Sequence, residues 1–435
     1  MYVSSSEGND ANDGLSEATP KRTINAGRAL LRSGYPDWIL FRRGDVFSEA
    51  GWEVGGYGGR SLIEPQVWST YGDGPRPVFT PPAGSGSPGF RFNWSPSNVA
   101  VIGLHIRAGA AGGGSGIFLI ASNLDLENFL IEDCLIEGFK DNINIQGTAA
   151  RPIRNLTIRR SVVVDAFPPG TAHSQGAYIN NVDGILIEES IFDNNGWRTA
   201  DRSDATIFNH NLYISSGNSP NAVIRKNIIA RASSHGLQLR CGGVIEDNLF
   251  LLNPINAQLG GGDPDANTHT SGVTGRMTGN VVLQASDINA TAQRGFGLLC
   301  YNIGMQGAVI SENIIAHNAS ASSTNDIPLY LWTDSYGAGV GNNNVLISEN
   351  IIYNWRGPLT INPPASAPPP PSTFTSLDGI VIERNDIQNI TDHRIIEIGV
   401  PAASAQVIFR NNRYWSEISD PQRFRLAGTA MSFGS

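Results

Sequence analysis

A short sequence pattern recurs along almost the whole of this 435-residue chain. Each copy has an apolar stretch ending in Ile, two mostly polar residues, Asn or a small residue, and a second apolar pair. The clearest copies are Ile224–Ile229, Ile310–Ile315 and Ile347–Ile352. Repeats of roughly 20 to 40 residues built from short strands are typical of solenoids, whose coils place equivalent side chains above one another. We therefore expect a mostly-β chain whose surface is organised as columns of residues.

The Asn position aligns copies of the pattern at intervals of 21 to 37 residues. The aligned residues are Cys134, Ser161, Ser190, Asn227, Asn248, Asn280, Asn313, Asn350, Asn385 and Asn412. A polar side chain here can hydrogen-bond the backbone of the next coil and so satisfy groups that would be buried without a partner. We interpret this column as a structural ladder, and the charged pairs before it as a solvated face.

Composition limits the class of protein. Gly (49) and Pro (25) are abundant, and no apolar run approaches the roughly 20 residues of a membrane-spanning helix. The net charge of −9 argues against a general nucleic-acid binder. The three cysteines, Cys134, Cys241 and Cys300, have no Cys-x-x-Cys spacing, so we expect neither a disulfide framework nor a zinc site. A partner among nucleic acids or membranes is not expected.

The pattern changes along the chain. Residues 1–95 are expected to form an N-terminal cap and the first coils, and residues 96–435 one continuous parallel β-helix. Thr23–Arg32 predicts a short amphipathic helix, with Thr23 as N-cap and Gly34 as its end, which would cover the open edge of the first coil. Insertions that could line one binding face interrupt the coils at 196–209, 261–272, 319–327 and 362–376.

A second strand follows the ladder strand in each coil, with its first and third residues inside and its second and fourth outside. One outward column then contains Asn144, Tyr178, Tyr213, Gln238, Gln258, Tyr330, Thr360 and Glu397. The next contains Gln146, Asn180, Ser215, Arg240, Gly260, Tyr301, Trp332 and Asn362, with Tyr301 placed by the weakest alignment. Asp141, Gln175, His210 and His235 lie just before these strands.

The coils around residues 173–240 combine reactive side chains of three kinds. Because adjacent coils lie about 4.8 Å apart, we expect His210 and His235 nearly in contact, with Tyr213 and Arg240 within one side-chain length. These four are the candidate catalytic residues. The candidate substrate-binding residues are His173, Tyr178, Asn180, Arg202, Gln238, Gln258, Tyr301 and Trp332.

The Ile-x-x-Asn-x-Ile coils and the opening Tyr2–Ser16, followed by a short helix, resemble the right-handed parallel β-helix proteins of the pectate-lyase-like superfamily. The resemblance covers the whole chain. It implies a carbohydrate groove along one sheet, in a family of polysaccharide lyases, glycoside hydrolases, uronate epimerases and phage tailspikes. The fold alone does not decide among these activities. The chain lacks the Asp-Pro-His-Glu run of alginate epimerases, the Asn-Thr-Asp and Gly-His-Gly pattern of polygalacturonases, and an obvious cluster of three Asp for the calcium of pectate lyases.

The His, Tyr and Arg set suits β-elimination of a uronate polysaccharide. Arg240 could neutralise the sugar carboxylate, a His could take the C5 proton, and Tyr213 could donate to the leaving oxygen. We therefore expect a polysaccharide lyase without a cofactor, although a calcium site through Asp141 or Asp183 stays open. We expect it to be secreted or periplasmic, with its signal peptide removed. The sequence does not indicate the oligomeric state.

Two other functions are open. A glycoside hydrolase needs two carboxyl groups roughly 5 to 9.5 Å apart, and no convincing stacked pair arises among Asp141, Asp183, Asp201, Asp204 and Asp263. A non-catalytic carbohydrate-binding or tailspike-like module could use the aromatic columns alone. The same His and Tyr residues could also serve only to join and pack neighbouring coils.

Overall fold

The structure is a computed structural model. It describes residues 1–431 apart from 50–51, 56–57, 83–88, 94–96, 110–112, 122–124, 169, 171, 198–205, 262–271, 290, 319–325, 333–341, 362–376, 389–393, 400–404, 417–423 and 427–428. The chain divides into two compact units, Met1–Asp204 (unit 1) and Ala205–Ser435 (unit 2). That residues 96–435 form one continuous domain stays a prediction. The four predicted insertions lie largely outside the described residues.

Unit 1 has three sheets. Sheet A consists of β1 (Tyr2–Val3), β2 (Trp38–Arg42), β5 (Gln66–Tyr71), β8 (Val99–Ile102), β11 (Glu127–Glu132), β14 (Ile153–Arg159) and β17 (Val182–Glu188). Sheet B consists of β3 (Val46–Phe47), β6 (Val78–Phe79), β9 (His105–Arg107), β12 (Leu135–Glu137), β15 (Val162–Val164) and β18 (Ile191–Asp193). Sheet C consists of β4 (Trp52–Gly55), β7 (Phe90–Asn93), β10 (Ser115–Ile120), β13 (Asp141–Gln146) and β16 (Gln175–Asn180).

Unit 2 repeats this plan. Its sheet A consists of β20 (Val223–Arg225), β23 (Gly243–Glu246), β26 (Val273–Thr278), β29 (Ile303–Ser311), β32 (Val345–Ser348), β35 (Leu377–Glu383) and β38 (Ala405–Arg410). Sheet B consists of β21 (Ile228–Ala230), β24 (Leu249–Leu251), β27 (Val281–Leu283), β30 (Ile314–Ala316), β33 (Ile351–Tyr353), β36 (Asp386–Gln388) and β39 (Arg413–Trp415). Sheet C consists of β19 (His210–Ile214), β22 (His235–Leu239), β25 (Ile255–Gly260), β28 (Phe296–Tyr301), β31 (Ile327–Trp332), β34 (Leu359–Ile361), β37 (Ile396–Ile398), β40 (Phe424–Leu426) and β41 (Thr429–Met431).

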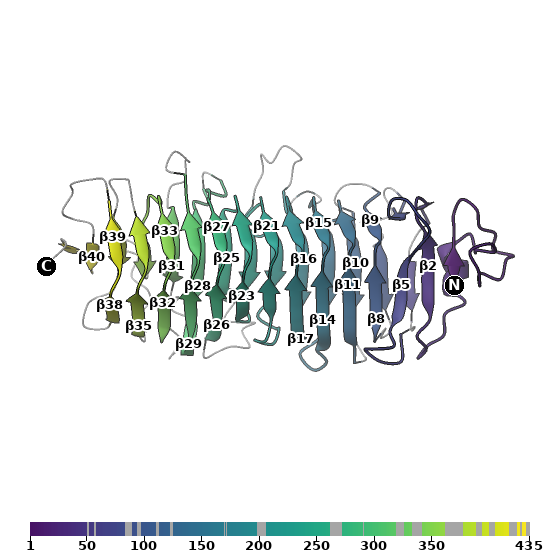
Figure 1. Cartoon of the computed structure of the whole chain (residues 1–435), viewed down its shortest axis with the longest axis horizontal. Coiled ribbons are helices and arrows are strands. Elements are labelled where there is room, and N and C mark those ends of the chain that lie inside the picture. Colours follow the sequence, from purple (N-terminus) through teal and green to yellow (C-terminus); the bar gives the residue numbers. More distant parts are fainter. Residues whose placement is uncertain are drawn as a thin grey trace. The chain divides into compact units, whose positions relative to one another are not determined.

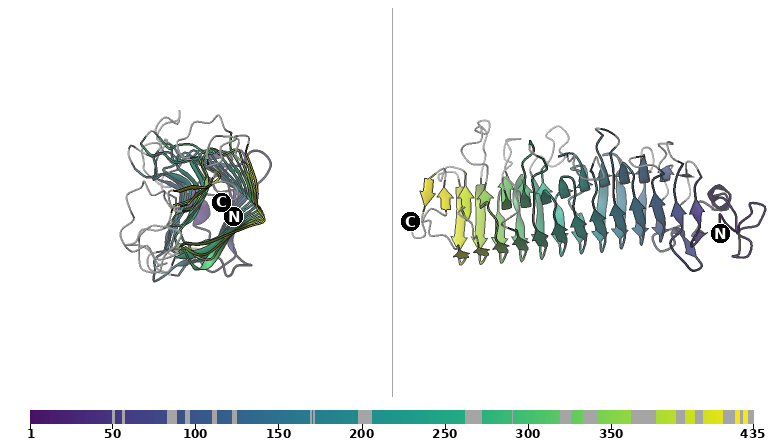
Figure 2. Two further views of the ribbon diagram at one scale, coloured as in Figure 1. Left: turned by 90° about the vertical axis from the view of Figure 1, so that its left-hand side faces the viewer. Right: turned by 90° about the horizontal axis from the view of Figure 1, so that it is seen from above.

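Consecutive coils stack with their strands parallel, except that β40 and β41 are antiparallel. Figures 1 and 2 show β8, β11, β14 and β17 side by side in unit 1, and β26, β29, β32 and β35 side by side in unit 2. Each unit is therefore a parallel β-helix, which confirms the predicted fold class. Each coil has three strands, however, whereas the sequence analysis counted two.

The extra strand arises from the ladder position. The residue before each aligned Asn, Ser or Cys has a positive φ of 50 to 66°, which turns the backbone out of the extended conformation. The Ile-x-x-Asn-x-Ile pattern is thus split between two sheets. For example, Ile224 belongs to β20 in sheet A and Ile229 to β21 in sheet B.

The ladder itself forms as predicted. Each backbone N–H at the ladder position donates to the side-chain oxygen of the next ladder residue, at 2.9–3.1 Å from Asn227 to Asn412. From Asn248 to Asn412, each carboxamide also donates to a carbonyl of a preceding coil, as Asn280 Nδ2 does to Ile245 O at 2.9 Å. Ser161 plays the same part in unit 1, where its Oγ accepts from the backbone N–H of Cys134 at 3.2 Å.

The N-terminal helix is shorter than predicted. α1 spans Ile24–Arg28, and Thr23 is its N-cap because its Oγ1 accepts from the backbone N–H of Ala26 at 3.1 Å. The prediction that it continues to Arg32 is wrong. Arg32 instead gives both its backbone N–H and its guanidinium to the carboxylate of Asp37, at 2.6–3.1 Å, which ends the helical hydrogen bonding. Within the described residues, no helix has the length and apolar character that crossing a membrane requires.

The three cysteines are buried and free. Burial raises the pKa of Cys134, Cys241 and Cys300 to about 12 in each case, and thiols react through the thiolate. We expect the native protein to resist alkylation by iodoacetamide near neutral pH, whereas the chain unfolded in urea should take up three labels. Mass spectrometry of both samples tests this, and rapid labelling of the native protein would contradict the buried positions.

Candidate active site

The predicted catalytic residues lie in sheet C of unit 2. His210 in β19 is paired in register with His235 in β22, and Tyr213 with Gln238. Leu212 and Leu237 are fully buried in the interior, and alternation directs the residues that follow them, Tyr213 and Gln238, to the outer face. The outer face is nevertheless covered, because the side chains of His210, His235 and Gln238 are each at most 5% exposed.

The two imidazoles are in direct contact, as predicted. His210 Nδ1 lies 3.2 Å from His235 Nδ1, and the ring centroids are 4.7 Å apart in an edge-to-face arrangement. The ring of Tyr213 meets His210 edge-on at 5.1 Å. These three side chains come from adjacent strands, so the stacking of two coils alone brings them together.

Hydrogen bonds set the tautomers of both rings. Gln258 Nε2 donates to Gly260 O at 2.8 Å, which turns Gln258 Oε1 toward His235 Nε2 at 3.1 Å. With Gln258 in this orientation, His235 carries its proton on Nε2, and the single lone pair of its Nδ1 lies between the hydroxyl of Ser234 at 2.8 Å and His210 Nδ1 at 3.2 Å. His210 then presents Nε2 as the basic nitrogen. His235 thus positions His210.

His235 stays neutral over the working pH range. Its pKa is lowered from 6.5 to about 3, mainly by burial and then by the positive charges of Arg240 and Arg294, while its hydrogen bond with Gln258 acts in the opposite direction. A neutral His235 can accept the Nδ1 proton of a charged His210. His210 is therefore the candidate base of this pair.

This pKa shift predicts acid sensitivity. The folded pKa lies below the unfolded one, so the contribution of His235 to stability is complete above about pH 6.5 and is lost as the pH falls toward 3. Between pH 6 and 4 we expect this group to lower the free energy of unfolding by about 1.4 kcal/mol per pH unit. Urea unfolding of the wild type and of H235Q at several pH values isolates the effect.

His173→Gln is the matched control, since His173 is exposed. It should retain the wild-type pH dependence, whereas H235Q should show a shallower one. Equal slopes for the wild type and H235Q would contradict the burial of a neutral imidazole.

Arg240 follows β22 directly and lies over Tyr213, with Cζ 5.1 Å from the ring centroid. Its Nε is buried without a hydrogen-bond partner, as is Gln238 Oε1. Across the described residues, Arg240 forms no ion pair with a carboxylate. A buried donor and a buried acceptor without partners, beside a half-buried Tyr, are groups that a bound polar ligand could satisfy.

Arg294 was missed by the sequence analysis. It precedes β28, a strand whose signal was not counted, and it is half-buried. Burial lowers its pKa, while the nearby Tyr330 and Asp287 raise it. Its charge acts on His235 together with that of Arg240, so two guanidiniums lower the pKa of this imidazole. The sequence signal was available: a positive residue just before an apolar strand in the same sheet.

The aromatic residues lie further along sheet C. Tyr301 pairs with Gly260 and Trp332 in register, which confirms the weakest alignment, and the two rings are 5.7 Å apart. Gly261 has a φ of +81°, and a Cβ there would lie 2.2 Å from the Tyr301 ring. Leu299 replaces a polar residue in the outer column and packs with Phe296 and Tyr330. Tyr330 is therefore only 5% exposed and covered by neighbours.

The remaining predicted residues belong to unit 1 or lie outside the described residues. His173, Tyr178 and Asn180 belong to unit 1, where His173 is exposed before β16 and the other two are half-buried on that strand. Arg202 lies outside the described residues. Asp141, on sheet C of unit 1, is buried beside Lys140 at 3.2 Å, and burial raises its pKa. Asp183 lies on sheet A, so it does not stack with Asp141.

Metal ions in proteins are commonly held by clusters of His, Cys, Asp and Glu side chains. No cluster of three or more such side chains occurs in the described part of the chain.

Comparisons with known proteins bear on the fold. Residues 89–265 match the family model described as the right handed beta helix region. With the parallel sheets of both units, this makes the chain a right-handed parallel β-helix. A search of curated protein sequences finds no match.

Several solved structures are similar at low identity. An alginate lyase from Paenibacillus sp. is 13% identical over 67% of this chain and 92% of its own, with a TM-score of 0.47. The A-module of a mannuronan C-5 epimerase from Azotobacter vinelandii is 15% identical over 100% of both chains, with a TM-score of 0.48. A GH136 lacto-N-biosidase from Eubacterium ramulus is 12% identical over 95% of this chain and 67% of its own, with a TM-score of 0.43. These three proteins are carbohydrate-active enzymes, but at such identities and scores they do not indicate the reaction of this chain.

Proposed function

We propose that this chain is a polysaccharide lyase that cleaves a uronate-containing polysaccharide by β-elimination. The observation that carries the proposal is the convergence of the His210–His235 pair, Tyr213 and Arg240 on the outer face of sheet C. Each part of an elimination has a candidate among these groups. The proposal includes a secreted or periplasmic location, where such polymers occur.

Arg240 would bind the carboxylate at C5 of the sugar. A guanidinium without a carboxylate partner among the described residues is available for a charge-assisted bidentate contact. Neutralising the carboxylate makes the neighbouring C5–H more acidic. Arg294 adds a second positive charge near the same imidazoles, which favours a negatively charged polymer over a neutral one.

His210 would take the proton from C5 through Nε2, and His235 would accept a hydrogen bond from the resulting imidazolium. The electron pair of the C5–H bond forms the C4–C5 double bond, and the C4–O bond breaks. Tyr213 would donate its hydroxyl proton to the departing glycosidic oxygen. Exchange with solvent then returns the proton to Tyr213 and removes it from His210.

The distribution of carboxylates favours elimination over hydrolysis. Hydrolysis of a glycosidic bond uses two carboxyl groups roughly 5 to 9.5 Å apart. On the strands of sheet C in unit 2, Glu397 is the single described carboxylate, and it is held by Arg425 at 3.2 Å and Arg394 at 3.4 Å. The described strands of this face thus offer no carboxylate pair.

A screen of alginate, pectate, glycosaminoglycans and bacterial exopolysaccharides tests the proposal. We expect ultraviolet absorbance from the new C4–C5 double bond on at least one polymer, and a loss of kcat/KM of about a hundredfold or more in R240M, since a charge-assisted hydrogen bond to the substrate is lost. R276M is the control, because Arg276 is paired with Glu246 on sheet A. New reducing ends without absorbance would refute elimination.

A further inference from the structure

A concave site lies on sheet B of unit 2, a different sheet from the one that carries the imidazole pair. It is a cavity of about 490 Å³ lined by Asp386, Gln388, Arg413, Tyr414 and Trp415. Asp386 pairs in register with Arg413, and Gln388 with Trp415. Alternation therefore directs these four to the outer face of the sheet, while Tyr414 lies between them on the strand.

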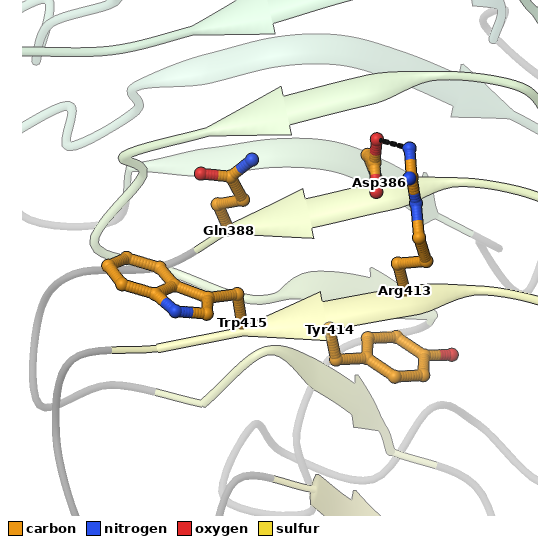
Figure 3. A pocket seen from close by; sticks show the side chains of 5 residues that line it. All are labelled: Asp386, Gln388, Arg413, Tyr414 and Trp415. Atoms are coloured by element: carbon orange, nitrogen blue, oxygen red, sulfur yellow. Dashed lines mark hydrogen bonds and ion pairs between the residues drawn. The ribbon is translucent and has the colours of Figure 1, made fainter.

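The side chains divide into an aromatic part and an ionic part. Figure 3 shows Trp415 and Gln388 on one side of the pocket and the ion pair of Asp386 with Arg413 on the other. Trp415 is 49% exposed, so its indole ring is open to contact with a ligand. Tyr414 is anchored below by an edge-to-face contact with Phe424 at 5.2 Å, which fixes the strand that carries Trp415.

The outer column adds a second aromatic ring. Tyr353 pairs in register with Gln388 and is 42% exposed, so the column reads Tyr353, Gln388, Trp415. With strands about 4.8 Å apart, the two aromatic positions lie about 10 Å apart, on either side of a carboxamide. This spacing matches the length of two sugar residues in an extended glycan, so the two rings would pack on alternate sugars.

We infer that this column and the adjoining Asp386–Arg413 pair form a binding site for neutral sugar residues, separate from the candidate active site. The carbon-bound hydrogens of a pyranose pack on exposed indole and phenol rings, and its hydroxyls pair with planar amide, carboxylate and guanidinium groups. The charges of Asp386 and Arg413 oppose each other, so the site has no net charge to favour a uronate. It would hold the protein on a neutral stretch of polysaccharide.

Binding measured by calorimetry tests the inference. The full-length protein carrying Tyr213→Phe is titrated with cellohexaose, mannohexaose, xylohexaose and hexamannuronate, so that no probe is consumed. We expect at least one neutral hexasaccharide to bind, and the further change W415A to raise its Kd about tenfold or more. Y353A should weaken binding in the same direction, and gives a second measurement should W415A fail to fold.

Trp38→Ala is the matched control, because Trp38 is another exposed indole, on β2 of unit 1. It should leave binding unchanged. The inference is overturned if no neutral hexasaccharide binds, if W415A and Y353A bind like W38A, or if these two variants lose affinity only for hexamannuronate. Because the readout is binding, a failure of the proposed elimination would leave this result unaffected.

Discussion

Replacing Tyr213 with Phe is expected to lower kcat on the uronate polymer by a factor of about 10² to 10⁴, the usual contribution of a general acid. The variant removes one oxygen and leaves the ring, its edge-to-face contact with His210 and the Arg240 guanidinium above it. Substrate affinity should therefore change little. Initial rates of double-bond formation, together with binding of the intact polymer, give both quantities.

Tyr35→Phe serves as the control, since Tyr35 is a partly exposed Tyr in unit 1 that also lies under a guanidinium, that of Arg32 at 4.3 Å. It should keep the wild-type rate. If Y213F kept full kcat, Tyr213 would not be the acid. If Y213F lost binding and stability along with rate, Tyr213 would have a packing role.

Asn280→Ala is expected to lower the free energy of unfolding by about 2–5 kcal/mol, the cost of leaving several buried polar groups without partners. The backbone N–H of Asn248 would lose its acceptor at 3.0 Å. The carbonyls of Ile245 and Thr278 would lose donors at 2.9 and 3.1 Å. Asn280 is fully buried, so water cannot replace these contacts without opening the stack.

Equilibrium unfolding in urea measures this loss, and Asn412→Ala is the internal comparison. Asn412 is the last ladder residue and only partly buried, and its carboxamide serves Asn385 and the carbonyl of Ile382. We expect a clearly smaller loss there, since solvent can reach the vacated groups. Equal and small losses in both variants would mean that the ladder does not stabilise the coils.

Much of the fold could be predicted because the sequence pattern follows from the geometry and the hydrogen bonding of the backbone. The ladder Asn, the inward Leu212 and Leu237, and the pairing of His210 with His235 all follow from a fixed strand spacing and a period of two. The third strand was missed because the residue before each ladder Asn, such as Lys226, adopts a positive φ. Unlike Gly, Lys does not indicate a turn with positive φ in a sequence.

The sequence predicted which residues form the candidate site better than it predicted what each of them does. Stacking placed the imidazoles, Tyr213 and Arg240 together, but the order of hydrogen bonds that makes His235 the supporting ring depends on Gln258 and Gly260 from the next coil. Arg294 was missed because β28, the strand that it precedes, was not counted among the second strands. The outer column was predicted without Leu299, which lies between Gln258 and Tyr330. An apolar residue at an outward position does not show in a sequence pattern that expects polar residues there.

The ladder also makes the stacking of the coils independent of the length of the connections between them. Its hydrogen bonds stay within 2.9–3.1 Å although the sequence between successive rungs varies from 21 to 37 residues. From Asn248 to Asn412, every side-chain oxygen accepts from the backbone N–H of the preceding ladder residue. Any coil can therefore follow any other at the ladder. Evolution can therefore lengthen or rebuild connections that face a polymer, and so change what is recognised. The ladder keeps the coils in register throughout.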